Sequence, residues 1–221
     1  MYKVMNNGCK IPMVGLGCFK AGEESCVRAV ETAISVGYRH FDTANHYENE
    51  KYVGQGIRNS GIDRSEVFVV SKIWPTSFHE PVKIIEFSLK ALNLDYIDAY
   101  LIHWPGLDAD ARYRVWETLM RYKDMGYIKG VGVSNFKKAH LIDLKEKFGV
   151  DPCMNEFEIS PWLQSRRTIS TVRSTISSCL PVSRLPRAIS WEIRRCRRLR
   201  KSTTRMWHRW WCAGICSAAT V

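Results

Sequence analysis

The sequence predicts an α/β protein and, within that class, a (β/α)8 TIM barrel. Short and almost continuously apolar strands alternate with helices that carry one apolar face, which is typical of a parallel sheet covered by helices. Six such units follow one another, which favours a barrel over a doubly wound sheet. No Gly-x-Gly-x-x-Gly opens a helix after the first strand, as a dinucleotide-binding domain would require. We therefore expect an incomplete barrel with about six of its eight units.

The N-terminal elements are predicted from turn signals and periodicity. Asn6-Asn7-Gly8 interrupts an alternating run and indicates a two-stranded hairpin over residues 2–13. Apolar residues recur at helical spacing over 23–36, and Gly37 ends that helix. The further elements expected up to residue 92 are strands at 14–17, 38–41 and 67–72 and helices at 48–58 and 81–92.

The same alternation continues to residue 158. A helix over 111–125 is closed by Gly126. Ser134-Asn135 is predicted to cap the next helix, which carries Leu141 and Leu144 on its apolar face. The strands expected in this part are 99–103, 130–133 and 154–158.

The distribution of charge divides the chain near Gln164. A net charge of +11 would suggest a nucleic-acid partner if the basic residues were spread over the domain. Residues 1–164 hold 20 Lys and Arg against 21 Asp and Glu, whereas residues 165–221 hold 13 against one. We therefore take 1–164 as the N-terminal part of the barrel and 165–221 as a separate basic tail, and we expect no nucleic-acid partner for the barrel.

Cysteine usage and hydropathy predict the compartment. The eight cysteines are irregularly spaced and no secretory signal opens the chain, so we expect reduced thiols in a cytoplasmic protein. No apolar run approaches the length of a membrane span, so a membrane is not expected as a partner. We expect the protein to act as a monomer on a small molecule.

Polar residues end the successive predicted strands. Asp42 ends the second strand, Lys72 the third, His103 the fourth and Ser134 the fifth. The C-terminal ends of barrel strands meet at one face, where active sites lie, and Tyr47 follows Asp42 in the same loop. Each residue alone is more often a cap, a surface residue or a structural residue. Their joint occurrence at strand ends indicates an active site.

Several strings, in this order, resemble the aldo-keto reductases. The strings that carry the resemblance are Gly15-Leu16-Gly17, Tyr38-Arg39-His40-Phe41-Asp42-Thr43-Ala44 with Tyr47 and Glu50, Ser71-Lys72-Ile73-Trp74, Leu101-Ile102-His103-Trp104-Pro105 and Gly132-Val133-Ser134-Asn135-Phe136. The resemblance covers residues 1–164. It implies a TIM barrel of the aldo-keto reductase type that reduces aldehydes and ketones to alcohols, with NADPH as the cofactor.

The resemblance also implies a role for each catalytic residue. Tyr47 would be the general acid that protonates the carbonyl oxygen. A tyrosine titrates near ~10, so a nearby Lys72 charge is needed to favour the phenolate, and Asp42 would hold that lysine in place. His103 would orient the carbonyl by a hydrogen bond.

Further positions are implied as binding residues. The expected substrate-binding residues are Phe19, Trp74, Trp104 and His103. The expected cofactor-binding residues are Gly17, Cys18, Asp42, Ser134, Asn135 and Glu156. Glu156 stands where the family usually has Gln, and a carboxylate cannot donate a hydrogen bond as an amide does. No metal is expected.

The tail after Gln164 departs from the family. Neither the helical nor the strand periodicity of apolar residues continues after Gln164, and the last two strand–helix units of the family are not found. One interpretation is a nucleic-acid-binding arm with stacking residues Trp207, Trp210 and Trp211. A second is a metal site, which lacks a fourth ligand beside His208, Cys212 and Cys216.

The third interpretation is an out-of-frame translation. Met and Trp have one codon each, so Met206-Trp207 must be encoded by ATG TGG. Reading two bases further on gives Val at Met206-Trp207, and Val again at Trp210-Trp211 and at Trp211-Cys212. The shifted sequence resembles the last units of the family. We favour a frame that slipped close to Gln164. Six strands would leave two unpaired edges, so we expect a truncated chain with little or no activity. The alternative is an inactive, reductase-derived binding protein with a basic nucleic-acid-binding tail.

Overall fold

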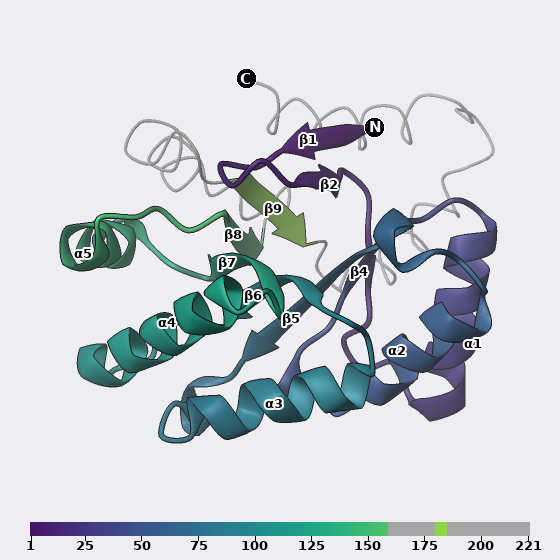
Figure 1. Ribbon diagram of the computed structural model, residues 1–221, viewed down its shortest axis with the longest axis horizontal. Coiled ribbons are helices and arrows are strands. Elements are labelled where there is room, and N and C mark those ends of the chain that lie inside the picture. The colour runs from purple at the N-terminus through teal and green to yellow at the C-terminus, as the bar shows by residue number, and fades with distance from the viewer. Residues whose placement is uncertain (159–179, 185–221) are drawn as a thin grey trace, which may run out of the picture.

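The computed structural model describes residues 1–158 and 180–184. In this part of the chain, parallel strands form one sheet in the order β3 (Leu16–Gly17), β4 (His40–Asp42), β5 (Phe68–Ile73), β6 (Ile97–Ile102), β7 (Ile128–Ser134), β8 (Met154–Glu158) and β9 (Leu180–Arg184). The helices between them are α1 (Glu23–Ser35), α2 (Glu50–Asn59), α3 (Pro81–Leu92), α4 (Ala109–Asp124) and α5 (Lys138–Phe148). The sheet curves and the helices lie along its outer side (Figure 1). This arrangement is that of a (β/α) barrel, so the predicted fold class is confirmed.

The predicted units are all present up to β8, and one predicted cap is wrong. The bounds of α3 and β8 are those expected, and the other elements differ by a few residues. Ser134 and Asn135 do not cap α5, because Ser134 still belongs to β7 and pairs with Glu156. Asn135 has a left-handed backbone with φ of 61°, and the N-cap of α5 is Lys137.

Strand β9 was not expected from the sequence. It pairs in parallel with β8 from Met154 with Leu180 to Glu158 with Arg184. Pro181 lies within this strand, and a proline has no backbone N–H to donate to the neighbouring strand. The sequence pattern therefore did not predict a strand here. The described sheet has seven strands, one more than the six that the sequence analysis placed, and the expected incomplete barrel of about six units agrees with it. The hypotheses on the tail 165–221, namely the out-of-frame translation, the nucleic-acid arm and the metal site, lie outside the described residues except at 180–184.

Alternation along the strands separates two cores. Successive side chains of a strand face opposite sides of the sheet. In β5, Val69 and Ile73 belong to the larger cluster that also contains helix residues such as Trp116. Phe68 and Val70 belong to a second cluster on the inner side, with Leu101 of β6. Lys72 continues the inner row of β5, so its side chain is directed into the barrel.

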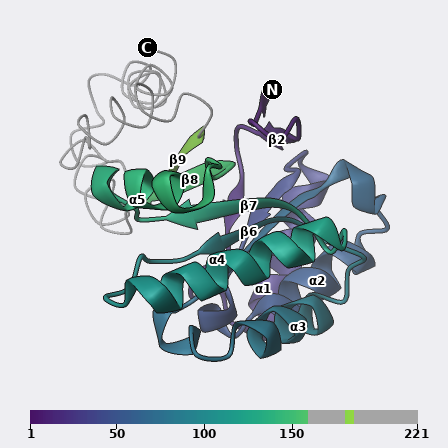
Figure 2. The same ribbon diagram turned by 60° about the vertical axis from the view of Figure 1, so that its left-hand side comes forward.

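The N-terminal hairpin closes one end of the inner face. Strands β1 (Tyr2–Val4) and β2 (Lys10–Pro12) pair antiparallel around the predicted turn. Met5 and Ile11 pack in the inner cluster. Figure 2 shows the hairpin on the side of the sheet opposite α3 and α4. Apolar residues therefore fill the inner face towards the hairpin, and the polar strand ends lie at the other end. None of the helices among the described residues is long and apolar enough to cross a lipid bilayer.

Candidate active site

The inner rows of successive strands end in polar residues at the same end of the barrel. In β6 the inner residues Ala99 and Leu101 are followed by His103, and in β8 Met154 is followed by Glu156. Because alternation has a period of two, a polar residue two positions after an inner apolar residue shares its face. The residues that end these rows are Asp42, Lys72, His103, Ser134 and Glu156.

Tyr47 is placed by a short 3-10 helix, η1 (Asn45–Tyr47), that the sequence did not predict. The loop around it is fixed by Asn49, which is buried. Its side-chain oxygen accepts a hydrogen bond from Thr43 Oγ1 at 2.6 Å, and its amide donates to the carbonyl of Cys18 at 2.7 Å. Sequence reasoning missed Asn49, because its bond to Cys18 joins it to a distant segment of the chain.

Lys72 is fully buried and has three acceptors around its ammonium group. Its Nζ lies 2.5 Å from Asp42 Oδ2, 2.9 Å from the carbonyl oxygen of Thr43 and 3.3 Å from Glu156 Oε2. Burial by itself lowers the pKa of Lys72, but the charges of Asp42 and Glu156 outweigh it, so the pKa is raised. The lysine therefore stays an ammonium ion inside the protein.

Tyr47 and His103 meet above this lysine. The hydroxyl of Tyr47 lies 3.2 Å from Nε2 of His103, within hydrogen-bonding distance. Lys72 Nζ lies 5.5 Å from the centre of the Tyr47 ring. The side-chain amide of Asn135 donates to the backbone carbonyl of His103 at 2.9 Å and so ties β6 to β7. The structure thus brings the four predicted catalytic residues together.

Aromatic side chains surround the Tyr47–His103 pair. The ring centres of Phe19 and Tyr47 are 4.8 Å apart. The rings of Trp74 and His103 pack edge to face, with their centres also 4.8 Å apart. His46, which the sequence gave no reason to single out, stacks on Trp74 at 4.4 Å. Trp104 follows His103 and is 44% exposed.

The expected cofactor-binding residues lie around the same cluster. Gly17 pairs with Asp42 at the end of β3, and the backbone N–H of Cys18 donates to the Asp42 carbonyl at 2.8 Å. Ser134 is buried, and its hydroxyl oxygen lies 3.0 Å from the amide nitrogen of Asn135. Gly17 and Cys18 thus adjoin Asp42 on β4, whereas Ser134, Asn135 and Glu156 approach from β7 and β8.

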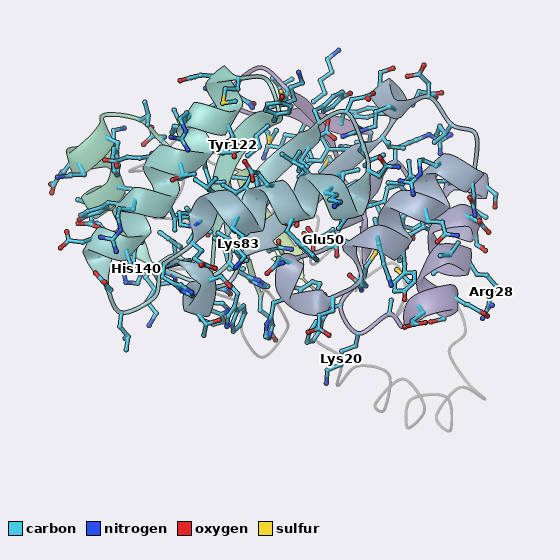
Figure 3. All side chains as sticks on the ribbon, turned by 60° about the horizontal axis from the view of Figure 1, so that its bottom comes forward. Lys20, Arg28, Glu50, Lys83, Tyr122 and His140 are labelled. Carbon is cyan, nitrogen blue, oxygen red and sulfur yellow. The ribbon has the colours of Figure 1, made fainter. Side chains whose placement is uncertain are left out.

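Glu50 connects the first turn of α2 to the strand that carries Lys72. It lies inside the molecule, whereas Lys20 and Arg28 project outward (Figure 3). Its carboxylate accepts a hydrogen bond from Ser71 at 2.5 Å. Burial raises the pKa of Glu50 to about 7. Because Glu50 follows Tyr47 by three residues and Ser71 precedes Lys72, this bond links the segments that carry Tyr47 and Lys72.

The model of the Aldo/keto reductase family matches residues 14–178 of this sequence. The chain belongs to the aldo/keto reductase family. The resemblance inferred from the sequence is thereby confirmed, and the match to this aldo/keto reductase family runs past Gln164.

Named aldo-keto reductase relatives agree with this assignment. The chain is 39% identical over 163 residues to the methylglyoxal reductase DkgA of Escherichia coli, which covers 74% of this chain and 59% of the relative. It is 38% identical to the glycerol 2-dehydrogenase (NADP(+)) of Saccharomyces cerevisiae, covering 77% of this chain and 64% of the relative. The chain therefore spans about 60% of the length of these curated aldo-keto reductases.

Solved aldo-keto reductases share the fold. An enzyme from a deep-sea metagenome library superposes with a TM-score of 0.79 at 33% identity, covering 88% of this chain and 70% of that one. A Bombyx mori aldo-keto reductase in complex with NADP gives 0.74 at 32% identity, covering 83% and 65%.

Proposed function

We propose that this site reduces aldehydes and ketones to alcohols, with hydride from NADPH and a proton from Tyr47. The observation that carries the proposal is the hydrogen bond between Tyr47 and His103 beside the buried, charged Lys72. The relatives named as a methylglyoxal reductase and an NADP(+)-linked glycerol dehydrogenase support this class of substrate and this cofactor. We expect a small-molecule carbonyl substrate and a cytoplasmic monomer.

The residues at the site fit the nicotinamide end of such a cofactor. A carboxamide offers a carbonyl oxygen that accepts hydrogen bonds and an NH₂ group that donates them. Ser134 has a hydroxyl that can donate, and the Glu156 carboxylate can accept, so the departure from Gln still leaves an acceptor there. When bound, NADPH supplies the hydride. The preference for NADPH over NADH rests on the family resemblance, because the segment that would bind the adenosine 2′-phosphate is not found in the sequence.

Proton delivery follows from the charges around Tyr47. A phenol with a pKa near ~10 donates reluctantly at neutral pH. The Lys72 ammonium stabilises the phenolate that donation leaves behind. Asp42 and the Thr43 carbonyl hold the ammonium in place. Because the Tyr47 hydroxyl oxygen and His103 Nε2 are 3.2 Å apart, one substrate carbonyl oxygen can approach both groups. His103 would orient this oxygen for protonation.

The aromatic residues around the pair suit a small carbonyl compound. Phe19, Trp74 and Trp104 would contact its carbon atoms, as the family resemblance implies. Phe19 and Trp104 are each 44% exposed, so both have surface to offer. His46, stacked on Trp74, adds a polar edge to this group.

Single-turnover kinetics tests the proposal. The full chain, in excess over NADPH, is mixed with methylglyoxal, and loss of NADPH absorbance is followed. A single turnover remains measurable at the low activity that the sequence predicts. We expect Tyr47→Phe to lower the rate by about 10²–10⁴-fold. Tyr2→Phe, which changes a tyrosine that is 57% exposed, is the matched control and should leave the rate unchanged.

NADPH binding, measured by its fluorescence, separates chemistry from binding. We expect Tyr47→Phe to bind NADPH as the wild type does. Equal turnover in the wild type and Tyr47→Phe would refute the proposed role. The alternative of a nucleic-acid-binding tail concerns 165–221, which lies outside the described residues except at 180–184, and stays a prediction. Salt-dependent binding of nucleic acid that is lost on deleting 165–221 would support it.

A further inference from the structure

The loop of residues 103–108 joins β6 to α4 and carries two residues of the site, His103 and Trp104. Trp104 is exposed, so the core does not enclose its indole. The rings of Phe19 and Trp74 pack against neighbouring rings, whereas no such ring contact involves Trp104 within the described residues. The position of this indole therefore depends mainly on the backbone that carries it.

Side chains from other elements hold the backbone carbonyls on both sides of Trp104. The side-chain amide of Asn135 donates to the carbonyl of His103, which precedes Trp104, at 2.9 Å. Nη1 of Arg112 on α4 donates to the carbonyl of Pro105, which follows Trp104, also at 2.9 Å. A residue that precedes a proline is biased towards an extended backbone. Trp104 therefore has little backbone freedom between these two hydrogen bonds.

Arg112 is itself held in place by α5. Its side chain is 7% exposed, and its Nη2 donates to Asp143 Oδ2 at 2.9 Å. The hydroxyl of Tyr113 donates to the other oxygen of this carboxylate. Burial by itself raises the pKa of Asp143, but the hydrogen bonds from Tyr113 and Arg112 outweigh it, so the pKa is lowered. Because a guanidinium is a rigid planar fork, the bond to Asp143 also fixes the direction in which Nη1 meets Pro105.

The same loop packs on the segment that follows Trp74. A Cβ added at Gly106 would lie 3.0 Å from the ring of Phe78 and 3.8 Å from Cβ of Pro75. Phe78 is buried, so it offers this loop a fixed surface. A displacement of the loop at Pro105 would therefore also disturb the contact with the segment that carries Trp74.

We propose that Arg112 is a positioning residue that holds the backbone at Trp104 and thereby sets how tightly the site binds carbonyl compounds with an aromatic ring. Arg112 acts through Pro105 and does not touch the substrate. A ring beside the carbonyl group reaches Trp104, whereas methylglyoxal, with three carbon atoms, offers Trp104 little surface. The part of the proposal that concerns the substrate rests on the proposed function.

Heteronuclear NMR of the tryptophan indole N–H groups tests the positioning without cofactor or substrate. The Trp104 signal is the one that is lost in Trp104→Phe. In the full chain, we expect Arg112→Leu to shift or broaden this signal, because the Pro105 carbonyl loses its donor. Arg114→Leu is the matched control, since Arg114 is exposed on the same helix, and it should leave the signal unchanged. An unchanged Trp104 signal in folded Arg112→Leu would overturn the proposal.

Circular dichroism shows whether each variant is folded. Should Arg112→Leu not fold, Arg112→Lys decides by the same indole signal. Lysine keeps the positive charge beside Asp143 but is shorter and lacks the planar fork. A shifted Trp104 signal in Arg112→Lys would support the proposal, and a signal identical to that of the wild type would overturn it.

Single-turnover kinetics tests the consequence for the substrate. The half-saturating concentration and the limiting rate are measured with methylglyoxal and with benzaldehyde. We expect Arg112→Leu to raise the half-saturating concentration of benzaldehyde about 3–10-fold, the contribution of one aromatic contact, and to leave that of methylglyoxal nearly unchanged. The limiting rate with methylglyoxal should be kept, because Asn135 still holds the carbonyl of His103. A general loss of structure would impair the reaction of both compounds alike.

The two measurements separate this inference from the proposed function. If the wild type reduces neither compound, the proposed function fails, and the indole signal still decides whether Arg112 positions Trp104. If methylglyoxal is reduced but benzaldehyde is not, or if Arg112→Leu affects both compounds equally, carbonyl reduction stands and the role of Arg112 in selectivity is refuted.

Discussion

Replacement of Lys72 by methionine removes the only charge that faces both carboxylates within the described residues. Met keeps most of the length and apolar volume of the lysine stem, so the change acts mainly on electrostatics. Asp42 loses an ion pair of 2.5 Å and Glu156 one of 3.3 Å. Both carboxyl groups then lose the ammonium ion of Lys72.

The expected loss of stability is large and depends on pH. Breaking a buried pair by removing one partner costs about 3–5 kcal/mol. The pKa of Asp42 is already raised to about 7, and loss of Lys72 raises it further. A carboxyl whose pKa is higher in the folded than in the unfolded state loses stability as pH rises, because the unfolded chain ionises more readily. We therefore expect a deficit of about 3–5 kcal/mol at pH 8 and a smaller one at pH 5.

Urea unfolding at both pH values measures this loss, and Lys145→Met is the matched control. Lys145 pairs with Asp151 at 3.0 Å, but its side chain is 46% exposed. Pairs of this kind contribute about 0–1 kcal/mol. The control should therefore change little at either pH. Equal effects of the two substitutions, or a Lys72→Met deficit that grows on acidification, would refute the reasoning.

Two further substitutions test the packing around the site. A Cβ added at Gly54 of α2 would lie 1.9 Å from the backbone oxygen of Leu92. Gly54→Ala should therefore lower the free energy of unfolding by about 1–3 kcal/mol, despite the helix propensity of alanine. Gln55→Ala, at the exposed neighbouring position, should not lower it in the same urea assay. Burial lowers the pKa of His40 to about 4, below the usual ~6.5. Between these two pH values the unfolded chain protonates this histidine and the folded protein does not, so stability falls as pH falls. The wild type should lose about 3 kcal/mol more than His40→Gln between pH 7 and pH 4, and parallel pH profiles would contradict this.

The fold and the gathering of the candidate catalytic residues could be predicted because their signals are local. Alternation along each strand fixes which side chains face inward, so Lys72 and His103 follow inner apolar residues by two positions. The strand–helix repeat then brings those strand ends together. The motifs that resemble the family lie at the same places, so both arguments led to one site.

What could not be predicted depends on contacts between distant segments. Ser134-Asn135 resembles a helix cap, but β7 pairs with β8 through Ser134, and this pairing displaced the cap to Lys137. Strand β9 contains a proline and has no clear alternation. Asn49 bonds to Cys18, and Glu156 contacts Lys72. No spacing within one segment encodes such pairs.

The strand order has a consequence for how the site assembles. Each strand of the sheet neighbours the next strand in the chain, so no pairing waits for a distant segment. Domains begin to fold from the N-terminus during synthesis, at about 5–20 residues per second. The segment that carries Asp42, Tyr47, Lys72 and His103 is therefore complete roughly fifty residues before Glu156 emerges. We expect the lysine to pair first with Asp42 alone and to acquire its second carboxylate only when β8 joins the sheet.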